Sequence, residues 1–231
     1  YLSSNHNLVL SAPTGSGKTE VAEMFIAETL SRQKRALYLV PFKSLSEEKF
    51  THRWMTPKHS FYHVSKMLMT GDYQMTDKRK AYLALAKIIA ATSEMLDHRT
   101  RHMASQHSQW IKDVGVLIVD EAHLLTDGSK NGDGRGHKLE CAIMRFVECN
   151  PTARIVLLSA TMPNVQELSL WLTTLTGRTT DLYQSTYRPC KLNRHFVPFF
   201  DGGNSFSKRS IQMQECTNIV RRYPQDQFLI F

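Results

Sequence analysis

The segment Ala12–Thr19, APTGSGKT, constrains the fold of this chain more than any other. It follows an apolar run at residues 7–11 and precedes residues 18–32, where apolar side chains recur at helical spacing. Glycines at positions 15 and 17 let backbone N–H groups wrap around an anion, and the helix adds the positive end of its dipole. A strand, a glycine-rich turn and a helix in this order predict a βα unit that binds phosphate groups.

Short apolar runs alternate with amphipathic stretches over the first 175 residues. The runs are continuously apolar, as in VGVLIV and RIVLL, which is typical of parallel strands buried on both faces. Repeated βα units predict an α/β fold: an open, doubly wound, mostly parallel sheet with helices on both faces. The predicted strands are 7–11, 36–40, 62–69, 87–91, 114–119 and 154–159, and the predicted helices are 18–32, 44–54, 93–103, 137–149 and 165–175.

The pattern changes after about Thr176. Residues 179–197 predict short strands, 201–205 a polar glycine-rich linker, 207–222 a helix and 227–231 a strand. We therefore expect residues 1–197 to form one domain, 198–206 a linker, and 207–231 the beginning of a second domain. We also expect both domains to be incomplete within this sequence.

The net charge of +8 indicates an anionic partner. The excess is concentrated between Lys43 and Lys112, where twelve lysines and arginines stand against six acidic residues. This favours nucleic-acid phosphates, although a solvated basic surface would have the same composition. The four cysteines include no CxxC pair, which predicts reduced thiols in an intracellular protein rather than a disulfide or a zinc site. No apolar run approaches the roughly 20 residues that cross a membrane.

The acidic pair Asp120–Glu121 follows the apolar run at residues 114–119. Because parallel strands end at one edge of a sheet, we expect this pair beside the glycine-rich loop. There Lys18 would reach the β- and γ-phosphates of a nucleotide, and Thr19 and Asp120 would hold Mg²⁺, the latter through water. Glu121 would orient or deprotonate the attacking water. An acidic pair after a strand can also simply cap the next helix, and the loop favours the catalytic interpretation.

Ser159-Ala160-Thr161 ends the next predicted strand and is expected at the same edge. Alone, this triplet could also be a helix cap before Pro163. Its order and spacing relative to the glycine-rich loop and the acidic pair make it the third motif of a set whose first two members are that loop and that pair.

The ordered motifs resemble the first motor domain of superfamily 2 DExH-box helicases over about residues 8–192. They are most similar to the Ski-like branch, which holds Hel-type DNA repair helicases, exosome-associated RNA helicases and the Brr-type spliceosomal helicase. Ala122 departs from this branch and gives a DEAH spelling that another helicase group also uses. The motifs are APTGSGKTE, VPFKSLSEEKF, TGDY, ATSEMLD, DEAHLL, RGHKLE, LSATMPN and TYRPCKL.

The resemblance implies a P-loop NTPase of RecA-like fold, with ATP and Mg²⁺ as its ligands. Its implied partners are single-stranded DNA or RNA and a second RecA-like domain of the same protein. The residues implied to bind ATP are Ala12, Pro13, Thr14, Gly15, Ser16, Gly17, Lys18, Thr19 and Glu20. Those implied to act in catalysis are Lys18, Asp120, Glu121 and His123, and those implied to couple ATP hydrolysis to movement are Ser159, Ala160 and Thr161.

The residues implied to hold the nucleic-acid backbone are Pro41, Lys43, Ser44, Thr70, Gly71, Thr92, Ser93 and Arg135, the last from a loop typical of this branch. For Lys43, Thr92 and Ser93, helix capping and surface charge are the alternative. The implied activity is ATP-driven, 3′-to-5′ movement along a single strand, in the nucleus, cytoplasm or nucleoid. This chain alone should hydrolyse ATP weakly.

The similarity of residues 91–125 to Hel-type enzymes favours DNA, and an RNA helicase stays the alternative. A double-strand translocase that does not unwind, and a non-enzymatic module that kept the fold, are further alternatives. The presence of Lys18, Asp120 and Glu121 argues against the non-enzymatic module.

Overall fold

The computed structural model describes residues 4–41, 48–71, 76–102, 106–125, 135–160, 162, 164–189, 196, 205–225 and 228. The chain divides into two compact units, Tyr1–Pro189 and Cys190–Phe231. Within its described residues the second unit holds helix α7 (Ser205–Arg222), close to the helix predicted at 207–222. None of the described helices has the length and apolar character needed to span a membrane.

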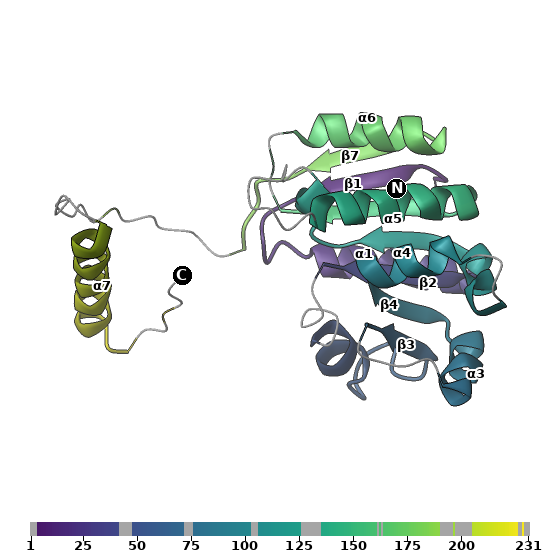
Figure 1. Ribbon diagram of the computed structural model, residues 1–231, viewed down its shortest axis with the longest axis horizontal. Helices are drawn as coiled ribbons and strands as arrows, with labels where there is room; N and C mark the ends of the chain where they lie inside the picture. Colours follow the sequence, from purple (N-terminus) through teal and green to yellow (C-terminus); the bar gives the residue numbers. More distant parts are fainter. Residues whose placement is uncertain are drawn as a thin grey trace. The chain divides into compact units, whose positions relative to one another are not determined.

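The first unit is built on a seven-stranded sheet in the order β3-β4-β2-β5-β6-β1-β7 (Figure 1). Every pairing between these strands is parallel, so all of them end at the same edge of the sheet. This confirms the predicted doubly wound α/β fold. The strands are β1 (Asn7–Ser11), β2 (Arg35–Val40), β3 (Lys66–Met69), β4 (Ile88–Thr92), β5 (Val114–Val119), β6 (Arg154–Ser159) and β7 (Thr180–Gln184).

Helices cover both faces of the sheet because successive side chains along each strand point to opposite sides. On β2, Leu37 and Leu39 belong to the core layer under α4, α5 and α6, whereas Ala36, Tyr38 and Val40 face α1 and η1. The helical elements are α1 (Lys18–Ser31), η1 (Glu48–Trp54), α3 (Asp77–Leu85), α4 (Ser93–Arg101), η2 (Gln106–Asp113), η3 (Ala122–Leu125), α5 (Arg135–Cys149) and α6 (Val165–Thr176).

The structure differs from the expected elements in several places. The strand predicted at 62–69 begins only at Lys66, because the preceding residues form turns in which Tyr62 N–H donates to His59 O at 2.9 Å. Helix α3 was not predicted. Residues 179–197 contribute one strand, β7, within their described part, and the predicted linker at 201–205 and strand at 227–231 lie largely outside the described residues.

Candidate nucleotide-binding site

The turn between β1 and α1 depends on two glycines in the left-handed region, Gly15 with φ 79° and Gly17 with φ 92°. A Cβ added at Gly15 would meet nothing within 4 Å, so backbone conformation rather than space requires glycine there. The turn leads directly into the first turn of α1. Backbone N–H groups there lack intrahelical partners and can bind an anion.

Lys18, the first residue of α1, folds over this turn. Its Nζ donates to the carbonyl oxygens of Ala12 at 2.7 Å and Pro13 at 2.9 Å. Ser16 Oγ is buried and has no hydrogen-bond partner among the described residues. A buried hydroxyl without a partner costs free energy, and a phosphate oxygen would accept its hydrogen bond. The residues of the loop therefore fit a phosphate group.

Asp120 directly follows β5 and is only 7% exposed. Its backbone N–H donates to Leu39 O at 2.9 Å, which extends the pairing of β5 with β2 by one residue. Its two carboxylate oxygens accept hydrogen bonds from its own chain: Oδ1 from the Glu121 N–H at 3.0 Å and Oδ2 from the Tyr38 hydroxyl at 2.7 Å. The orientation of this carboxylate is thus set by the protein.

Tyr38 is the donor in this bond. Burial, and then the charge of Asp120, raise the pKa of its hydroxyl well above the ordinary value, so the hydroxyl keeps its proton. The sequence pattern presented Tyr38 only as one of the apolar residues of a strand. Its partner lies 82 positions further along the chain, and no local signal connects the two.

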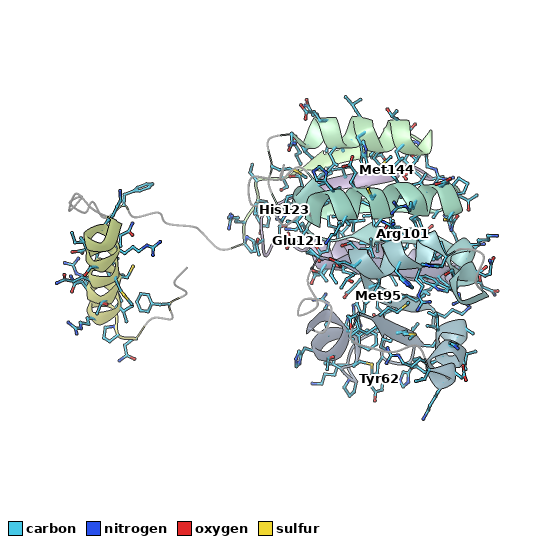
Figure 2. The ribbon with its side chains drawn as sticks, viewed as in Figure 1. Tyr62, Met95, Arg101, Glu121, His123 and Met144 are labelled. Carbon is cyan, nitrogen blue, oxygen red and sulfur yellow. The ribbon has the colours of Figure 1, made fainter. Side chains whose placement is uncertain are left out.

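Glu121 adopts a left-handed conformation with φ 52°, which is uncommon for a residue with a side chain. Such a conformation costs roughly 1–3 kcal/mol and persists where surrounding structure imposes it. Figure 2 shows Glu121 and His123 close together at the edge where the strands end. Their side chains are about one-third exposed, and His123 Nδ1 lies 3.2 Å from Glu121 Oε2. The carboxylate is therefore accessible, unlike that of Asp120.

The loop and the acidic pair line one cavity of about 420 Å³. Eight of the predicted site residues meet there, and Arg53, which the sequence motifs did not indicate, completes the wall. The lining residues are Thr14, Gly15, Gly17, Lys18, Thr19, Glu20, Arg53, Asp120 and Glu121.

No group of three or more His, Cys, Asp or Glu side chains in the described part of the chain could hold a metal ion by itself. Mg²⁺ is usually held by one or two protein oxygens and by substrate phosphates, with water completing its shell. The Thr19 hydroxyl and the Asp120 carboxylate, lining the same cavity as the loop, fit that pattern.

Arg53 on η1 is held by two acidic residues of α1. Its guanidinium donates to Glu23 at 2.6 and 3.0 Å and to Glu20 at 2.9 Å, and Trp54 Nε1 donates to Glu23 at 2.9 Å. Burial alone would raise the pKa of Glu23, but the hydrogen bonds from Arg53 and Trp54 outweigh it and lower this pKa. The hydrogen bond from Arg53 also lowers the pKa of Glu20. Glu20, predicted to contact ATP, thus lines the cavity with its carboxylate paired to Arg53.

A second cavity of about 740 Å³ also borders the loop. Ser16, Gly17 and Lys18 border it, and β1, β7 and α1 supply mostly aliphatic and aromatic side chains. Ala12 borders it as well. Its lining residues are Leu8, Leu10, Ala12, Ser16, Gly17, Lys18, Val21, Met24, Phe25, Tyr183, Ser185 and Tyr187.

Strand β6 lies between β5 and β1, so Ser159 and Ala160 stand next to the loop as expected. The Ser159 carbonyl accepts a hydrogen bond from the Ala12 N–H at 3.0 Å. Ser11 Oγ and Ser159 Oγ both donate to the Ala160 carbonyl, at 3.1 and 2.9 Å. The N-cap of α6 is Asn164, so Ser159 is not a helix cap, and Thr161 lies outside the described residues.

The residues predicted to contact nucleic acid follow the neighbouring strands. Thr70 and Gly71 follow β3, and Thr92 and Ser93 stand where β4 passes into α4. Thr70, Thr92 and Ser93 are buried, and the Thr92 side chain makes no capping hydrogen bond to α4. Thr92 therefore occupies the N-cap position of α4, as the capping alternative expects, but its side chain does not cap the helix.

Pro41 follows β2 and is partly exposed. Lys43 and Ser44 lie outside the described residues, and Arg135 is described only as the first residue of α5. Nucleic-acid contact by all of these residues stays a prediction.

Comparison with known proteins places this geometry in a family. The chain is 37% identical over 204 residues to the ATP-dependent DNA helicase Hel308 of Pyrococcus abyssi, covering 86% of this chain and 25% of the relative. It is 31% identical over 238 residues to the ATP-dependent DNA helicase MER3 of Saccharomyces cerevisiae, covering 99% of this chain and 19% of the relative. The chain thus spans about a quarter or less of the length of these relatives.

Solved structures share the fold at lower sequence identity. A crystal structure of the DUF1998 helicase MrfA matches with a TM-score of 0.62 at 18% identity, covering 97% of this chain and 38% of that one. The Hef helicase domain of Pyrococcus furiosus matches with a TM-score of 0.56 at 20% identity, covering 78% of this chain and 35% of that one. The model of the DEAD/DEAH box helicase family matches residues 1–168. With its phosphate-binding loop, its DEAH segment and the Ski-like similarity of its sequence, the chain belongs to the DEAD/DEAH box helicases.

Proposed function

We propose that this chain is the ATP-hydrolysing motor domain of a helicase that moves along single-stranded DNA. One observation carries the proposal: the phosphate-binding loop, Asp120 and Glu121 line a single cavity at the edge where the parallel strands end. The cavity combines a cation for phosphate, an oriented buried carboxylate and an accessible second carboxylate. These are the parts that hydrolysis of a nucleoside triphosphate requires.

In this mechanism the Lys18 ammonium exchanges its two carbonyl partners for the β- and γ-phosphate oxygens of ATP. Thr19 and, through water, Asp120 would hold Mg²⁺, which would supply positive charge against the developing negative charge. Glu121 accepts a proton from the attacking water. The water oxygen bonds to the γ-phosphorus, and the bond between the γ-phosphorus and the oxygen that bridges it to the β-phosphate breaks. The products are ADP and inorganic phosphate.

Ser159 and Ala160 lie where the β6 end meets the loop, so a change in the loop can pass directly to the segment that continues into Thr161 along the chain. We propose that it transmits the nucleotide state to a second RecA-like domain of the same protein. That domain would supply the opposite wall of the ATP site. Residues after β2, β3 and β4 would hold the backbone of the DNA strand between the two domains.

The choice of DNA over RNA draws support from the names of the relatives, Hel308 and MER3, both ATP-dependent DNA helicases. The basic excess between Lys43 and Lys112 suits either nucleic acid. Contacts to phosphate dominate such binding and carry little sequence information. We therefore expect the affinity of the protein for single strands to fall steeply as salt is raised.

Strand displacement by the full-length protein tests this proposal. We expect ATP-dependent opening of a DNA duplex that carries a 3′ single-stranded tail, little opening of one with a 5′ tail, and none by a Lys18→Ala variant. ATP hydrolysis without displacement of either duplex would indicate a translocase that does not unwind. A preference for tailed RNA duplexes would replace the DNA assignment by an RNA helicase.

A further inference from the structure

We propose that Tyr38 is a positioning residue that fixes the Asp120 carboxylate for binding of Mg²⁺–nucleotide. This inference rests on the proposed function, since it assigns to Asp120 the role of a Mg²⁺ partner. Tyr38 would not touch the nucleotide. It would act through Asp120 alone.

Two hydrogen bonds fix the Asp120 carboxylate. Oδ2 accepts from Tyr38 at 2.7 Å, and Oδ1 accepts from the backbone N–H of Glu121 at 3.0 Å. One bond to each oxygen prevents the carboxylate from rotating about its Cβ–Cγ bond. Its acceptor sites toward the cavity therefore keep a constant direction, which a metal with strict octahedral geometry requires.

The surroundings of Tyr38 hold its ring in place. Tyr38 is fully buried on β2, and its ring and the Trp54 ring form a T-shaped pair with a centroid distance of 5.4 Å and an interplanar angle of 89°. Trp54 is itself fully buried and donates to Glu23, which also accepts from Arg53. A ring held on this side has little freedom to withdraw its hydroxyl from Asp120.

This arrangement links two residues that line the cavity. Arg53 and Asp120 both line it. Glu23, Trp54 and Tyr38 connect them through a continuous series of contacts. Glu121, whose backbone N–H donates to Asp120, adjoins the same series. A shift of η1 would thus reach the metal-binding carboxylate through Tyr38.

A simpler role for Tyr38 is structural, because a buried tyrosine hydroxyl needs some hydrogen-bond partner and Asp120 provides one. The two roles differ in what they predict for metal dependence. A purely structural role would alter stability, and nucleotide binding would change equally with and without Mg²⁺. A positioning role would change specifically the Mg²⁺-dependent part of binding.

The test uses Tyr38→Phe in the full-length protein, which removes the hydroxyl and keeps the ring against Trp54. Tyr82→Phe on α3, at a half-exposed tyrosine, is the matched control. Binding of a fluorescent, non-hydrolysable ATP analogue is measured over a Mg²⁺ titration and in EDTA. Because a hydrogen bond to a charged group is lost, we expect Tyr38→Phe to raise the half-saturating Mg²⁺ concentration about fivefold, with binding in EDTA unchanged. Tyr82→Phe should match the wild type.

An Asp120→Asn background provides a second test that does not depend on how well the single variant folds. Adding Tyr38→Phe to Asp120→Asn should leave Mg²⁺ dependence as it is in Asp120→Asn, because the group that Tyr38 positions is already altered. An unchanged Mg²⁺ titration for Tyr38→Phe, or equal losses with Mg²⁺ and with EDTA, would overturn the positioning role. If the wild type itself showed no Mg²⁺-dependent binding, the proposed function would fail instead.

Discussion

The ends of β1 and β5 and the ends of β3 and β4 meet the same edge of one sheet, yet they present different side chains. The first region has an ammonium on Lys18 and carboxylates on Asp120 and Glu121, all lining one cavity. The second has small hydroxyls on Thr70, Thr92 and Ser93, and these side chains are buried. Charged groups held in fixed geometry can stabilise a transition state, whereas hydroxyls beside backbone groups can only bind.

Under the proposed function, the first region would carry out ATP hydrolysis and the second would bind the nucleic-acid strand. Loss of one charged group near the loop should remove most of the chemistry, because no neighbour can replace it. Loss of one hydroxyl near β3 or β4 should weaken strand binding slightly, because many contacts and the basic surface share that binding.

The largest effect is expected for Lys18→Ala. Its ammonium would otherwise offset charge on the transferred phosphoryl group, so we expect the ATP hydrolysis rate to fall at least about a thousandfold. The control is Lys87→Ala, at an exposed lysine just before β4, at the opposite edge of the sheet. A hydrolysis rate for Lys18→Ala equal to that of the control would rule out the proposed mechanism.

The next effect is expected for Glu121→Gln, which keeps the size of the side chain and removes its basicity. We expect hydrolysis to fall by about a hundredfold and ATP affinity to change less than about threefold, measured by steady-state kinetics and equilibrium binding. Glu148→Gln on α5, at an exposed residue, is the control. Loss of ATP binding in Glu121→Gln would mean that Glu121 has a structural role in the loop after β5.

A smaller effect, on stability, is expected for Arg53→Ala. Arg53 lowers the pKa of Glu20 and Glu23 below about 4.5, so these groups stabilise the folded state above that pH. This stabilisation is lost as the pH falls through the lowered pKa values. Without Arg53 the free energy of unfolding at pH 7 should drop by about 1 kcal/mol.

Urea unfolding at pH 7 and at pH 3.5 measures this linkage. The wild type should lose more stability between the two pH values than Arg53→Ala does. Arg32→Ala, which removes the ion pair between the C-cap residue of α1 and Glu28, should behave like the wild type. If the free energy of unfolding depended on pH equally in the wild type and in Arg53→Ala, Arg53 would not stabilise the ionised forms of Glu20 and Glu23.

The smallest effect is expected for Thr70→Val. Thr70 Oγ1 is buried and makes no hydrogen bond within the described chain, so the folded protein should lose no stability and gain up to about 1 kcal/mol. If the hydroxyl serves the nucleic-acid backbone, affinity for single-stranded DNA should fall about twofold to threefold in a fluorescence anisotropy titration. Thr173→Val on α6 should leave that affinity unchanged. A clear loss of stability in Thr70→Val would show that the hydroxyl has a partner in the fold.

Much of the fold was predictable because the strands are continuous apolar runs and the loop has a fixed place between a strand and a helix. Because Lys18 and the acidic pair each follow a predicted parallel strand, their position at one edge of the sheet was predictable as well. Helix α3 escaped prediction because it packs little apolar surface: Leu83 is its one residue that is fully buried, so its sequence shows no clear helical stripe.

The parts of the site that could not be predicted depend on contacts between distant segments. Arg53 meets Glu20 and Glu23 only because η1 packs against α1, and Tyr38 meets Asp120 only because β2 pairs with β5. The left-handed backbone of Glu121 also has no signature in the sequence, since it is imposed by the turn after β5. Such features follow from tertiary packing, which motif spacing does not contain.

The rate of ATP hydrolysis by the full-length protein, measured with and without single-stranded DNA, tests the central claim most directly. We expect DNA to stimulate the rate in the wild type, and we expect Glu121→Gln to lose both the basal and the stimulated rate while still binding ATP. A hydrolysis rate that does not change when DNA is added, or a Glu121→Gln variant that hydrolyses ATP as fast as the wild type, would contradict the assignment of this cavity as the ATP hydrolysis site of a DNA helicase.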